Sequence, residues 1–521
     1  MRIVVQKLVK QSLVMFVGVL LCVAIPAPPV SAAPGKGTQQ SSAQLNARID
    51  RILRSSDAFR GFWGIEVAEL PGGRIIFSRD AQHLFHPASN MKLFTTAAAL
   101  EKLGPDFVFR TTVESVSEPD AQGRVPGIDL VGRGDPTFEE AVVSTNKAEA
   151  KSDGSPVLQQ LAVQLKARGV LEITGPLVAD DSYFLCQPYS QGWAADELLW
   201  GYAAPVSALA FNSNSLQLRI KPGPKAGDRA EVWLAPLAGG YRINNSLETG
   251  AAGTENRLFV ERGADPTQLD VWGRIPLDAG ESAERVAILH PQQLLGELFR
   301  QALEEAGIRV RGGVEVRQIT RAEAAAGHSL PQPASRVVLA EHDSLPLREI
   351  VKVTNKESRN FYAEMLLRTL AREVKHSGSL EDGLSVLSEF ARQTGAGQGE
   401  TTFADGSGLS WDDLVTPDSL VKLLTYVARS PAFDIFQETL PVAGVDGTLA
   451  GRFKGTRVER RIHAKTGTKE QVNALSGYME AASGKRLVFS IIGNNHALKE
   501  SEGAATVDRI ALAIHDSFSR R

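Results

Sequence analysis

A serine with a lysine three residues later gives this sequence its first candidate chemistry. Ser89 and Lys92 lie in HPASNMK, residues 86–92, at the start of a predicted helix that ends at Gly104. Side chains three positions apart on a helix share one side, so the amine can reach the hydroxyl. The hydroxyl becomes a nucleophile only if that amine is neutral, which requires burial or a nearby cation to lower its pKa. Backbone amides at the helix start can then bind a developing oxyanion.

Ser-x-x-Lys is a weak signal by itself, because the chain contains it three times. One further copy, at residues 144–147, falls in a polar stretch without a helical apolar face. The other, at residues 419–422, lies on a predicted helix that begins after Pro417 and whose leucines face the core. We interpret both copies as solvated or structural residues. The prediction of a nucleophile at Ser89 therefore depends on companion segments elsewhere in the chain.

The first companion is Ser358-Arg359-Asn360, which separates a predicted helix ending near Lys356 from another that begins at Phe361. A hydroxyl and an amide on such a turn can relay a proton and orient a substrate amide. The segment alone is equally compatible with an ordinary surface turn.

The second companion is Lys465-Thr466-Gly467-Thr468, which follows an alternating stretch that predicts a strand. An ammonium group on a strand edge beside the nucleophile would lower the pKa of a neighbouring amine and hold a substrate carboxylate. Gly467 would let a substrate backbone approach closely. The hypothesis of a catalytic site depends on all three segments converging in space.

Together the segments match the set Ser-x-x-Lys, Ser-x-Asn and Lys-Thr-Gly, which penicillin-binding proteins share with class A β-lactamases. Five longer stretches narrow the resemblance: PASNMK at 87–92, GRGDP at 132–136, NKESRNFYAE at 355–364, DGSGLS at 405–410 and LPVAGVDGTL at 440–449. From about residue 45 onward the chain resembles the low-molecular-mass class C penicillin-binding proteins. This is the D-alanyl-D-alanine carboxypeptidase/endopeptidase family that includes penicillin-binding protein 4.

The resemblance implies acyl transfer in two steps on peptidoglycan stem peptides and cross-links, with β-lactam antibiotics as inhibitors. Lys92 would deprotonate Ser89, Ser89 would attack the carbonyl of the penultimate D-Ala, and Ser358 would relay the proton to the leaving D-Ala. The implied substrate-binding groups are the Asn360 amide, the carboxylate-binding Lys465 and Thr466, Gly467 beside them, and the backbone amides of Ser89 and Thr468 around the oxyanion. Arg359 departs from the Asp or Asn that the family more often has there, which puts substrate preference at that edge in question.

Two rival functions fit the same motifs. A β-lactamase would turn penicillin over quickly instead of staying acylated, and a catalytically silent cell-wall-binding protein would keep the fold without the chemistry. The long separation of Ser89 from Ser358 favours the resembling family, because β-lactamases keep these motifs much closer together. The sequence leaves open whether carboxypeptidase or endopeptidase activity dominates.

The resemblance, together with the order of predicted helices and strands along the chain, predicts an α/β (α+β) transpeptidase- or β-lactamase-like domain. Its antiparallel sheet would be flanked by helices. Its two parts would be residues 44–112 and 339–521, and residues 113–338 would form inserted β-rich accessory domains. The first part shows a strand pair at 62–67 and 74–77, and the second a hairpin at 472–480 and 486–493 followed by a terminal helix. Helices are predicted near 45–54, 157–169 and 292–307, the last two ending in Gly.

Residues 1–33 predict a cleaved signal peptide, since positive residues precede an apolar run too short to span a bilayer and small residues follow it. Residues 34–43 read as a linker. We therefore expect a periplasmic protein with at most peripheral membrane contact. Cys186 would be the one cysteine left after cleavage, and we interpret it as a small buried hydrophobe.

Composition limits the partners. The 521 residues are too many for one ordinary domain, and 43% hydrophobic with 22% charged residues is typical of a soluble globular protein. A net charge of −3 gives no basic field for nucleic acid. No histidine or cysteine cluster predicts a metal site, and we expect no cofactor. The sequence leaves homodimerisation open.

Overall fold

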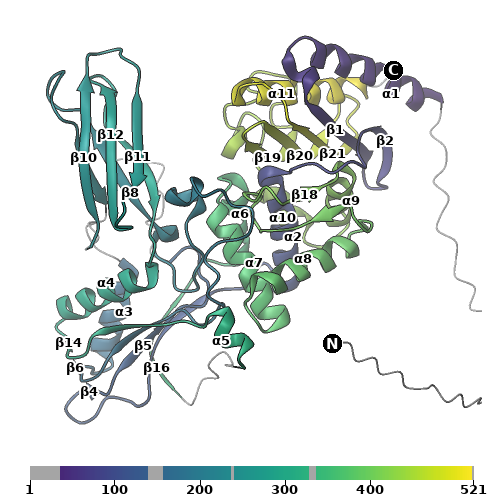
Figure 1. Cartoon of the computed structure of the whole chain (residues 1–521). Coiled ribbons are helices and arrows are strands. Elements are labelled where there is room, and N and C mark those ends of the chain that lie inside the picture. The colour runs from purple at the N-terminus through teal and green to yellow at the C-terminus, as the bar shows by residue number, and fades with distance from the viewer. Residues whose placement is uncertain (1–35, 139–155, 236–239, 328–335, 519–521) are drawn as a thin grey trace, which may run out of the picture.

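A five-stranded antiparallel sheet forms the centre of the larger body in the computed structural model, which describes residues 36–138, 156–235, 240–327 and 336–518 (Figure 1). Strands from both ends of the chain build it in the spatial order β19-β20-β21-β1-β2. Their bounds are β1 Phe62–Glu69, β2 Arg74–Arg79, β19 Ile462–Lys469, β20 Val472–Glu480 and β21 Arg486–Asn494. The predicted strand pair and C-terminal hairpin are confirmed.

Helices cover both faces of this sheet (Figure 1). On one face α1 (Lys36–Arg54) and α11 (Glu500–Ser517) pack together and enclose an apolar core with the strands. On the other face α9 (Pro417–Val427) packs against β1, β20 and β21. Because both faces are covered, β20 and β21 are buried along almost their whole length. The predicted antiparallel sheet flanked by helices is confirmed, and the terminal helix packs on the sheet as expected.

A helical layer lies beneath the sheet and carries most of the motif residues. It shares one apolar core with the lower face of the sheet. Its elements are η2 (Ala88–Met91), α2 (Lys92–Leu103), α6 (Leu347–Lys356), α7 (Asn360–Lys375), α8 (Leu380–Gln393) and α10 (Phe433–Thr439), with the short strands β17 (Thr401–Thr402) and β18 (Leu414–Val415). The turn η1 (Asp57–Arg60) packs with α1, and η6 (Gly447–Leu449) contacts α6 and β19; their buried residues belong to the core on the other face of the sheet.

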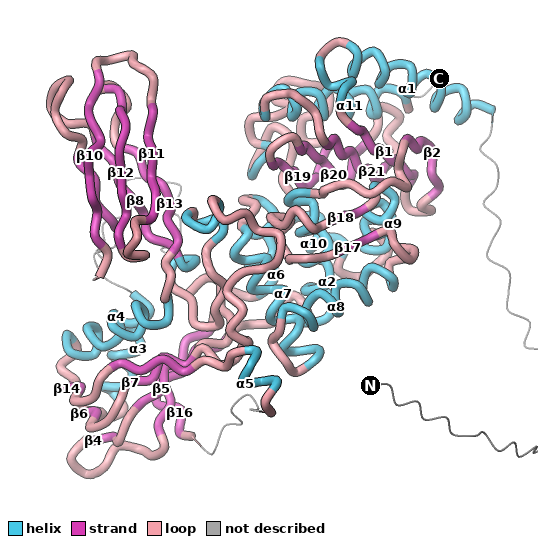
Figure 2. The backbone as a smooth tube through the Cα atoms, in the orientation of Figure 1, coloured by secondary structure: helices cyan, strands magenta, loops and turns pink. Residues whose placement is uncertain are grey.

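The stretch between α2 and α6 is rich in strands, as predicted, and forms the second body of the molecule (Figure 2). Its first half contains β3 (Arg110–Ser115), β4 (Arg124–Val125), β5 (Ile128–Val131), α3 (Pro156–Ala167), β6 (Glu172–Ile173), β7 (Leu177–Asp180), η3 (Glu197–Leu199), η4 (Gly201–Ala203) and η5 (Asn212–Asn214). The second half contains β8 (Ser215–Lys221), β9 (Glu231–Ala235), β10 (Arg242–Gly250), β11 (Arg257–Arg262), β12 (Gln268–Pro276), β13 (Ser282–Ala287), α4 (Pro291–Glu305), β14 (Arg309–Val310), β15 (Val314–Arg317), α5 (Arg321–Ala325) and β16 (Val337–Asp343).

These strands form four sheets around a separate apolar core. The largest has the order β15-β7-β5-β3-β16, so the strand that leaves the helical layer pairs with the strand that returns to it. The helices α3 and α4 pack together beside it. The other three sheets are β14-β6-β4, β13-β8-β9 and β10-β12-β11. The turns after α3 and α4 use Gly169 and Gly307 at φ +88° and +77°, which are the predicted glycine ends.

Two expectations need correction. The first helix begins at Lys36 and not near Leu45, so part of the predicted linker at 34–43 is helical; lysine, glutamine and alanine are good helix formers and extend the packed part of the helix toward the N-terminus. Cys186 is only partly buried and carries a free thiol. It lies where the chain pairs loosely with Thr320, at the edge of the second body. None of the helices in the described part of the chain is long and apolar enough to cross a membrane.

Candidate active site

The candidate nucleophile lies on a tight turn and not on the α-helix itself. Ser89 is in η2, directly before α2 begins at Lys92, whereas the sequence suggested one continuous helix. Ala88 has φ +44°, a value that non-glycine residues rarely adopt and that often marks a functional turn. Asn90 donates a hydrogen bond to the Ser476 hydroxyl at 2.8 Å, which fixes the turn against β20. Ser89 stays partly exposed while the residues around it are buried.

Lys92 is fully buried and donates three hydrogen bonds from Nζ. The acceptors are Ser89 Oγ at 2.9 Å, Asn360 Oδ1 at 2.7 Å and the Ser407 carbonyl at 2.6 Å. Burial lowers the pKa of Lys92 to about 8, although the charges of Asp405 and other buried carboxylates act in the opposite direction. A substantial fraction of the amine is therefore neutral near pH 8 and able to take the serine proton.

Lys465 reaches the same region from β19 at the edge of the sheet. Its Nζ donates to Ser358 Oγ at 2.8 Å and to the Thr466 carbonyl at 3.0 Å. Ser358 has φ +60°, again in the left-handed region, which turns its hydroxyl toward this amine. Burial lowers the pKa of Lys465 well below its usual value, and the nearby Lys92 lowers it further. Of the two causes that the sequence left open, burial or a nearby cation, burial is the main one for both amines.

Gly467 and its neighbouring threonines fix β19 against the turn that carries the nucleophile. A Cβ on Gly467 would lie 2.6 Å from the Pro87 carbonyl, so this glycine permits a close approach of the chain to itself. We predicted that it would admit a substrate backbone. The Thr466 hydroxyl donates to Thr448 at 2.8 Å, and Thr468 is exposed at the strand edge.

A cleft of about 850 Å³ opens at these groups. Ser89, Asn360 and Thr468 line it together with Tyr202 and Lys469. The direct contacts from Lys92 to Ser89 and Asn360, and from Lys465 to Ser358, bring three segments far apart in sequence into one place. The arrangement pairs a hydroxyl with a partly neutral amine, and a second hydroxyl with a second amine, which is suited to acyl transfer.

Sequence reasoning did not show that four ionisable side chains are buried together near Lys92. Glu364, Arg368, Asp405 and Asp413 are all buried without access to solvent, and burial together with the Asp405 charge raises the pKa of Glu364 to about 7. Burial raises the pKa of Asp413 well above its usual value for the same reasons. A sequence signal for Glu364 exists, because it lies one helical turn after Asn360 and so shares its side of α7.

The remaining candidates do not join the site. On α9, Ser419 donates to the Thr416 carbonyl at 2.7 Å and Lys422 pairs with Glu400 and Asp418, so this Ser-x-x-Lys copy is structural, as predicted. The copy at 144–147 lies outside the described residues. Within the described ranges, no three His, Cys, Asp or Glu side chains lie together in a way that could hold a metal ion.

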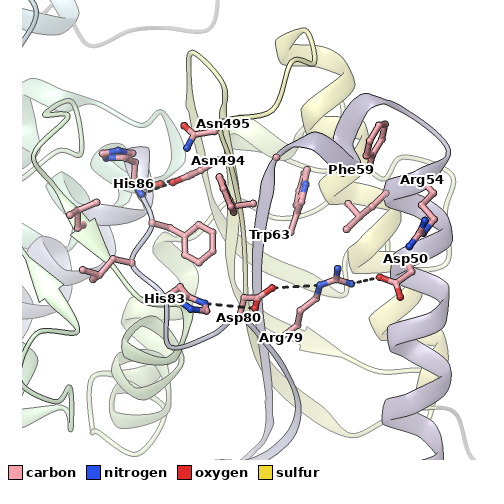
Figure 3. Close-up of a pocket in the computed structure, with 16 residues that line it drawn as sticks. Asp50, Arg54, Phe59, Trp63, Arg79, Asp80, His83, His86, Asn494 and Asn495 are labelled. Carbon is pink, nitrogen blue, oxygen red and sulfur yellow. Dashed lines mark hydrogen bonds and ion pairs between the residues drawn. The ribbon is translucent and has the colours of Figure 1, made fainter.

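A second cavity of about 720 Å³ borders the segment that leads into η2 (Figure 3). His86 lines it, and Asn494 clamps the His86 backbone by accepting from its N–H at 2.7 Å and donating to its carbonyl at 3.1 Å. On the far wall Arg79 pairs with Asp50 at 2.7 Å (Figure 3). These contacts hold the segment leading into η2, so the cavity borders the scaffold of the site and contains none of the predicted catalytic groups.

Comparison with known proteins gives the same reading as the geometry. Residues 45–514 match the model of the D-Ala-D-Ala carboxypeptidase 3 (S13) family. The chain is 35% identical over 465 residues to a D-alanyl-D-alanine carboxypeptidase of Actinomadura sp. (strain R39), covering 87% of this chain and 81% of that protein. It is 26% identical to D-alanyl-D-alanine carboxypeptidase DacB of Haemophilus influenzae, over 80% of this chain and 81% of that one.

Among solved structures, penicillin binding protein 4 (dacB) from Haemophilus influenzae superposes with a TM-score of 0.75 at 23% identity. The superposition covers 89% of this chain and 98% of that one, so the two share their fold, inserted strands included. The fold is thus the transpeptidase-like one that the motifs implied. With a family match over nearly all the described residues and a relative above 30% identity, the chain belongs to the D-Ala-D-Ala carboxypeptidase 3 (S13) family.

Proposed function

We propose that this chain is a serine-type D-alanyl-D-alanine carboxypeptidase and endopeptidase that acts on peptidoglycan peptides through an acyl-enzyme. Membership of the family and the activity printed in the names of its relatives support the proposal. The observation that carries it is the pair of hydrogen bonds from the buried Lys92 amine to Ser89 and Asn360 at one edge of an open cleft.

In the acylation step the neutral Lys92 amine takes the proton of Ser89 as Oγ attacks the carbonyl of the penultimate D-Ala. The backbone amides of Ser89 and Thr468 bind the oxyanion, because both residues line the cleft. The bond to the terminal D-Ala then breaks. Ser358, held by Lys465, relays to the leaving amine the proton that Lys92 took, so that Lys92 is neutral again and Ser358 keeps its hydroxyl proton.

Substrate binding uses the remaining groups. Asn360 lines the cleft beside Ser89 and, in addition to its hydrogen bonds with Lys92 and Tyr202, holds the peptide amide of the substrate. Lys465 and Thr466 bind the terminal carboxylate, whose negative charge raises the pKa of the Lys465 amine again and restores its positive charge. Water finally attacks the acyl-enzyme and frees the shortened peptide. A β-lactam acylates Ser89 in the same way, and its ring-opened product leaves slowly.

Release of D-alanine from a peptide ending in D-Ala-D-Ala tests the activity. The wild-type chain should release it, and Ser89→Ala should not. Ser419→Ala is the matched control, because it removes the serine of another Ser-x-x-Lys that is structural. Equal release by wild type and Ser89→Ala would reject the proposal, as would no release by the wild type.

We also propose that the chain is exported to the periplasm with residues 1–33 as a cleaved signal peptide. The pattern of charge and hydropathy in that segment supports this, although it lies outside the described residues. For the mature chain we propose a transpeptidase-like domain formed by residues 44–112 and 339–521, with accessory domains at 113–338. The separate apolar core of the inserted strands supports this division.

A further inference from the structure

One segment of the inserted stretch contacts the site as well as the inserted strands. We call residues 187–202 the wall segment. The flanking residues Phe184, Ala204 and Val206 are buried in the core that α2, α6 and α7 share. Figure 1 shows this part of the chain passing beside α6 and α7. The wall segment is therefore built into the active-site body although it belongs to the insertion by sequence.

The wall segment contacts several elements that carry motif residues. The Tyr202 carbonyl accepts a hydrogen bond from the Asn360 amide at 3.0 Å, and Ser190 donates to Glu364 on α7 at 3.3 Å. Glu197 lies 3.5 Å from Lys469 at the end of β19. These contacts place the wall along one side of the site.

Trp193 makes the contact that connects the wall segment to Lys92, the proposed general base. Its Nε1 donates to Asp405 Oδ2 at 2.9 Å, and the Asp405 side chain has no exposure to solvent. Asp405 also accepts from the backbone amides of Ser407 at 2.9 Å and Gly408 at 2.6 Å. Asp405 Oδ2 also accepts from the Ser410 backbone amide at 2.7 Å and from the Ser407 hydroxyl at 3.2 Å. The carboxylate thus holds the loop 405–410 around itself, and the indole is the donor that reaches it from the wall segment.

The same loop presents the acceptor that holds Lys92. The Ser407 carbonyl accepts from Lys92 Nζ at 2.6 Å, the shortest of the three hydrogen bonds of that amine. A continuous path of hydrogen bonds therefore runs from Trp193 through Asp405 and Ser407 to Lys92. Trp193 is not among the residues that line the cleft at Ser89.

Electrostatics agree with this geometry. Burial alone would raise the pKa of Asp405, but hydrogen bonds from Asp413, Gly408 and Trp193 hold it below its usual value. Asp405 therefore stays charged and Asp413, whose pKa is raised, keeps a proton. The indole N–H is thus a charge-assisted donor, the stronger kind of hydrogen bond.

We propose that Trp193 is a positioning residue for catalysis: through Asp405 it fixes the loop whose Ser407 carbonyl keeps Lys92 Nζ within reach of Ser89. The inserted stretch thereby completes the site it interrupts in sequence. The inference rests on the proposed function, because it assigns a role to the base of that reaction.

Trp193→Phe in the full chain tests the proposal, since it keeps the ring and removes the N–H donor. We expect kcat for D-alanine release to fall roughly 10- to 100-fold, because small misplacements of a catalytic group have effects of this size. KM should stay within about twofold, and thermal melting should confirm that the variant is folded. Trp272→Phe is the control, because that indole stacks on Phe259 in a sheet of the second body.

A rescue variant and a double variant distinguish a positioning role of Trp193 from a role in general packing. Trp193→His puts a ring nitrogen at the equivalent position, so it should recover part of the kcat lost by Trp193→Phe. Asp405→Asn should also lower kcat, and the double variant should be no slower than Asp405→Asn by itself.

The proposal would be overturned if Trp193→Phe left kcat unchanged, or if it raised KM while kcat stayed intact. It would also be overturned if the loss of kcat in the double variant equalled the product of the losses in the two single variants. These outcomes are distinct from failure of the proposed function, in which the wild type itself would release no D-alanine.

Discussion

At the scale of single residues, the reactivity of Lys92 depends on a balance between burial and charge. Burial lowers its pKa to about 8, whereas Asp405, Glu364 and Asp413 act to raise it. The neutral amine is the active form, and its fraction grows as the pH rises through this pKa. We therefore predict that the rate of acylation by a β-lactam increases with pH and levels off above about pH 8. A rate that falls across this range would contradict a lysine base.

Glu364→Gln tests which groups set that pKa. The glutamine carbonyl can still accept the hydrogen bond that Gly406 N–H donates at 2.9 Å, but the negative charge is lost. Asp405 on the neighbouring loop and Arg368 on α7 are the charged groups that act on it, and its own charge acts on Lys92 of α2. Removing a carboxylate beside an amine lowers the amine pKa, so the rise of acylation rate should move to lower pH. An unchanged pH profile would show that Glu364 does not act on Lys92.

Lys92→Met removes the base while keeping an unbranched side chain in the buried site. We predict that acylation slows by roughly 10²- to 10⁴-fold, the usual contribution of general base catalysis. The matched control is Lys422→Met in the structural Ser-x-x-Lys copy, which should acylate within about twofold of wild type. Stopped-flow acylation at pH 8 compares them, and equal slowing of both variants would count against the assignment.

The sequence predicted the pairing of Ser89 with Lys92 because side-chain spacing on a helical turn is local. It did not predict why the amine is neutral. That depends on α7 and the loop 405–408 closing over Lys92, residues more than 250 positions away. Burial of a charged group is a property of tertiary packing, so spacing alone could not decide between burial and a neighbouring cation.

At the scale of elements, the close approach of β19 to the η2 turn brings together the strand and the turn whose backbone amides we propose as the oxyanion site. We predict that Gly467→Ala destabilises the protein by about 1–3 kcal/mol, because the new Cβ would lie 2.6 Å from the Pro87 carbonyl. Acylation should slow as the strand moves away from Ser89. Gly72→Ala in the first hairpin is the control, since nothing lies within 4 Å of its added Cβ. Thermal melting and acylation rates check both, and a neutral Gly467→Ala would contradict the close approach.

Local sequence was sufficient for the hairpin predicted at 472–480 and 486–493, because its two apolar strands flank a short turn. It was insufficient at Ser89, where a 3-10 turn precedes the helix. Ala88 there adopts φ +44° because Gly408 approaches it: a Cβ on Gly408 would lie 1.9 Å from the Ala88 carbonyl. A long-range contact of this kind has no signature in local sequence.

At the scale of the whole molecule, the chain contains cores that share few elements. The sheet and helical layer enclose two of them, and the inserted strands enclose a third. We predict two calorimetric unfolding transitions. Acylation by penicillin should raise only the transition of the body that contains Ser89, because the ligand makes contacts there alone. A single transition, or an equal rise in both, would contradict this division.

The long separation of the motifs was enough to predict an insertion rich in strands. It did not show that the wall segment returns to the catalytic body. Trp193 and Trp200 lie seven positions apart in the same segment, and their residue type does not distinguish their roles. In the structure Trp200 packs against the core of the inserted strands, whereas Trp193 donates to a buried carboxylate of the site. Their different partners follow from topology and not from residue type.

Mass spectrometry of the intact protein and its peptides after incubation with benzylpenicillin tests the central claim most directly. The account predicts one penicilloyl adduct on the wild-type chain, mapped to the peptide that contains Ser89, and no adduct on Ser89→Ala. An adduct that persists on Ser89→Ala, or one that maps to another serine, would contradict it.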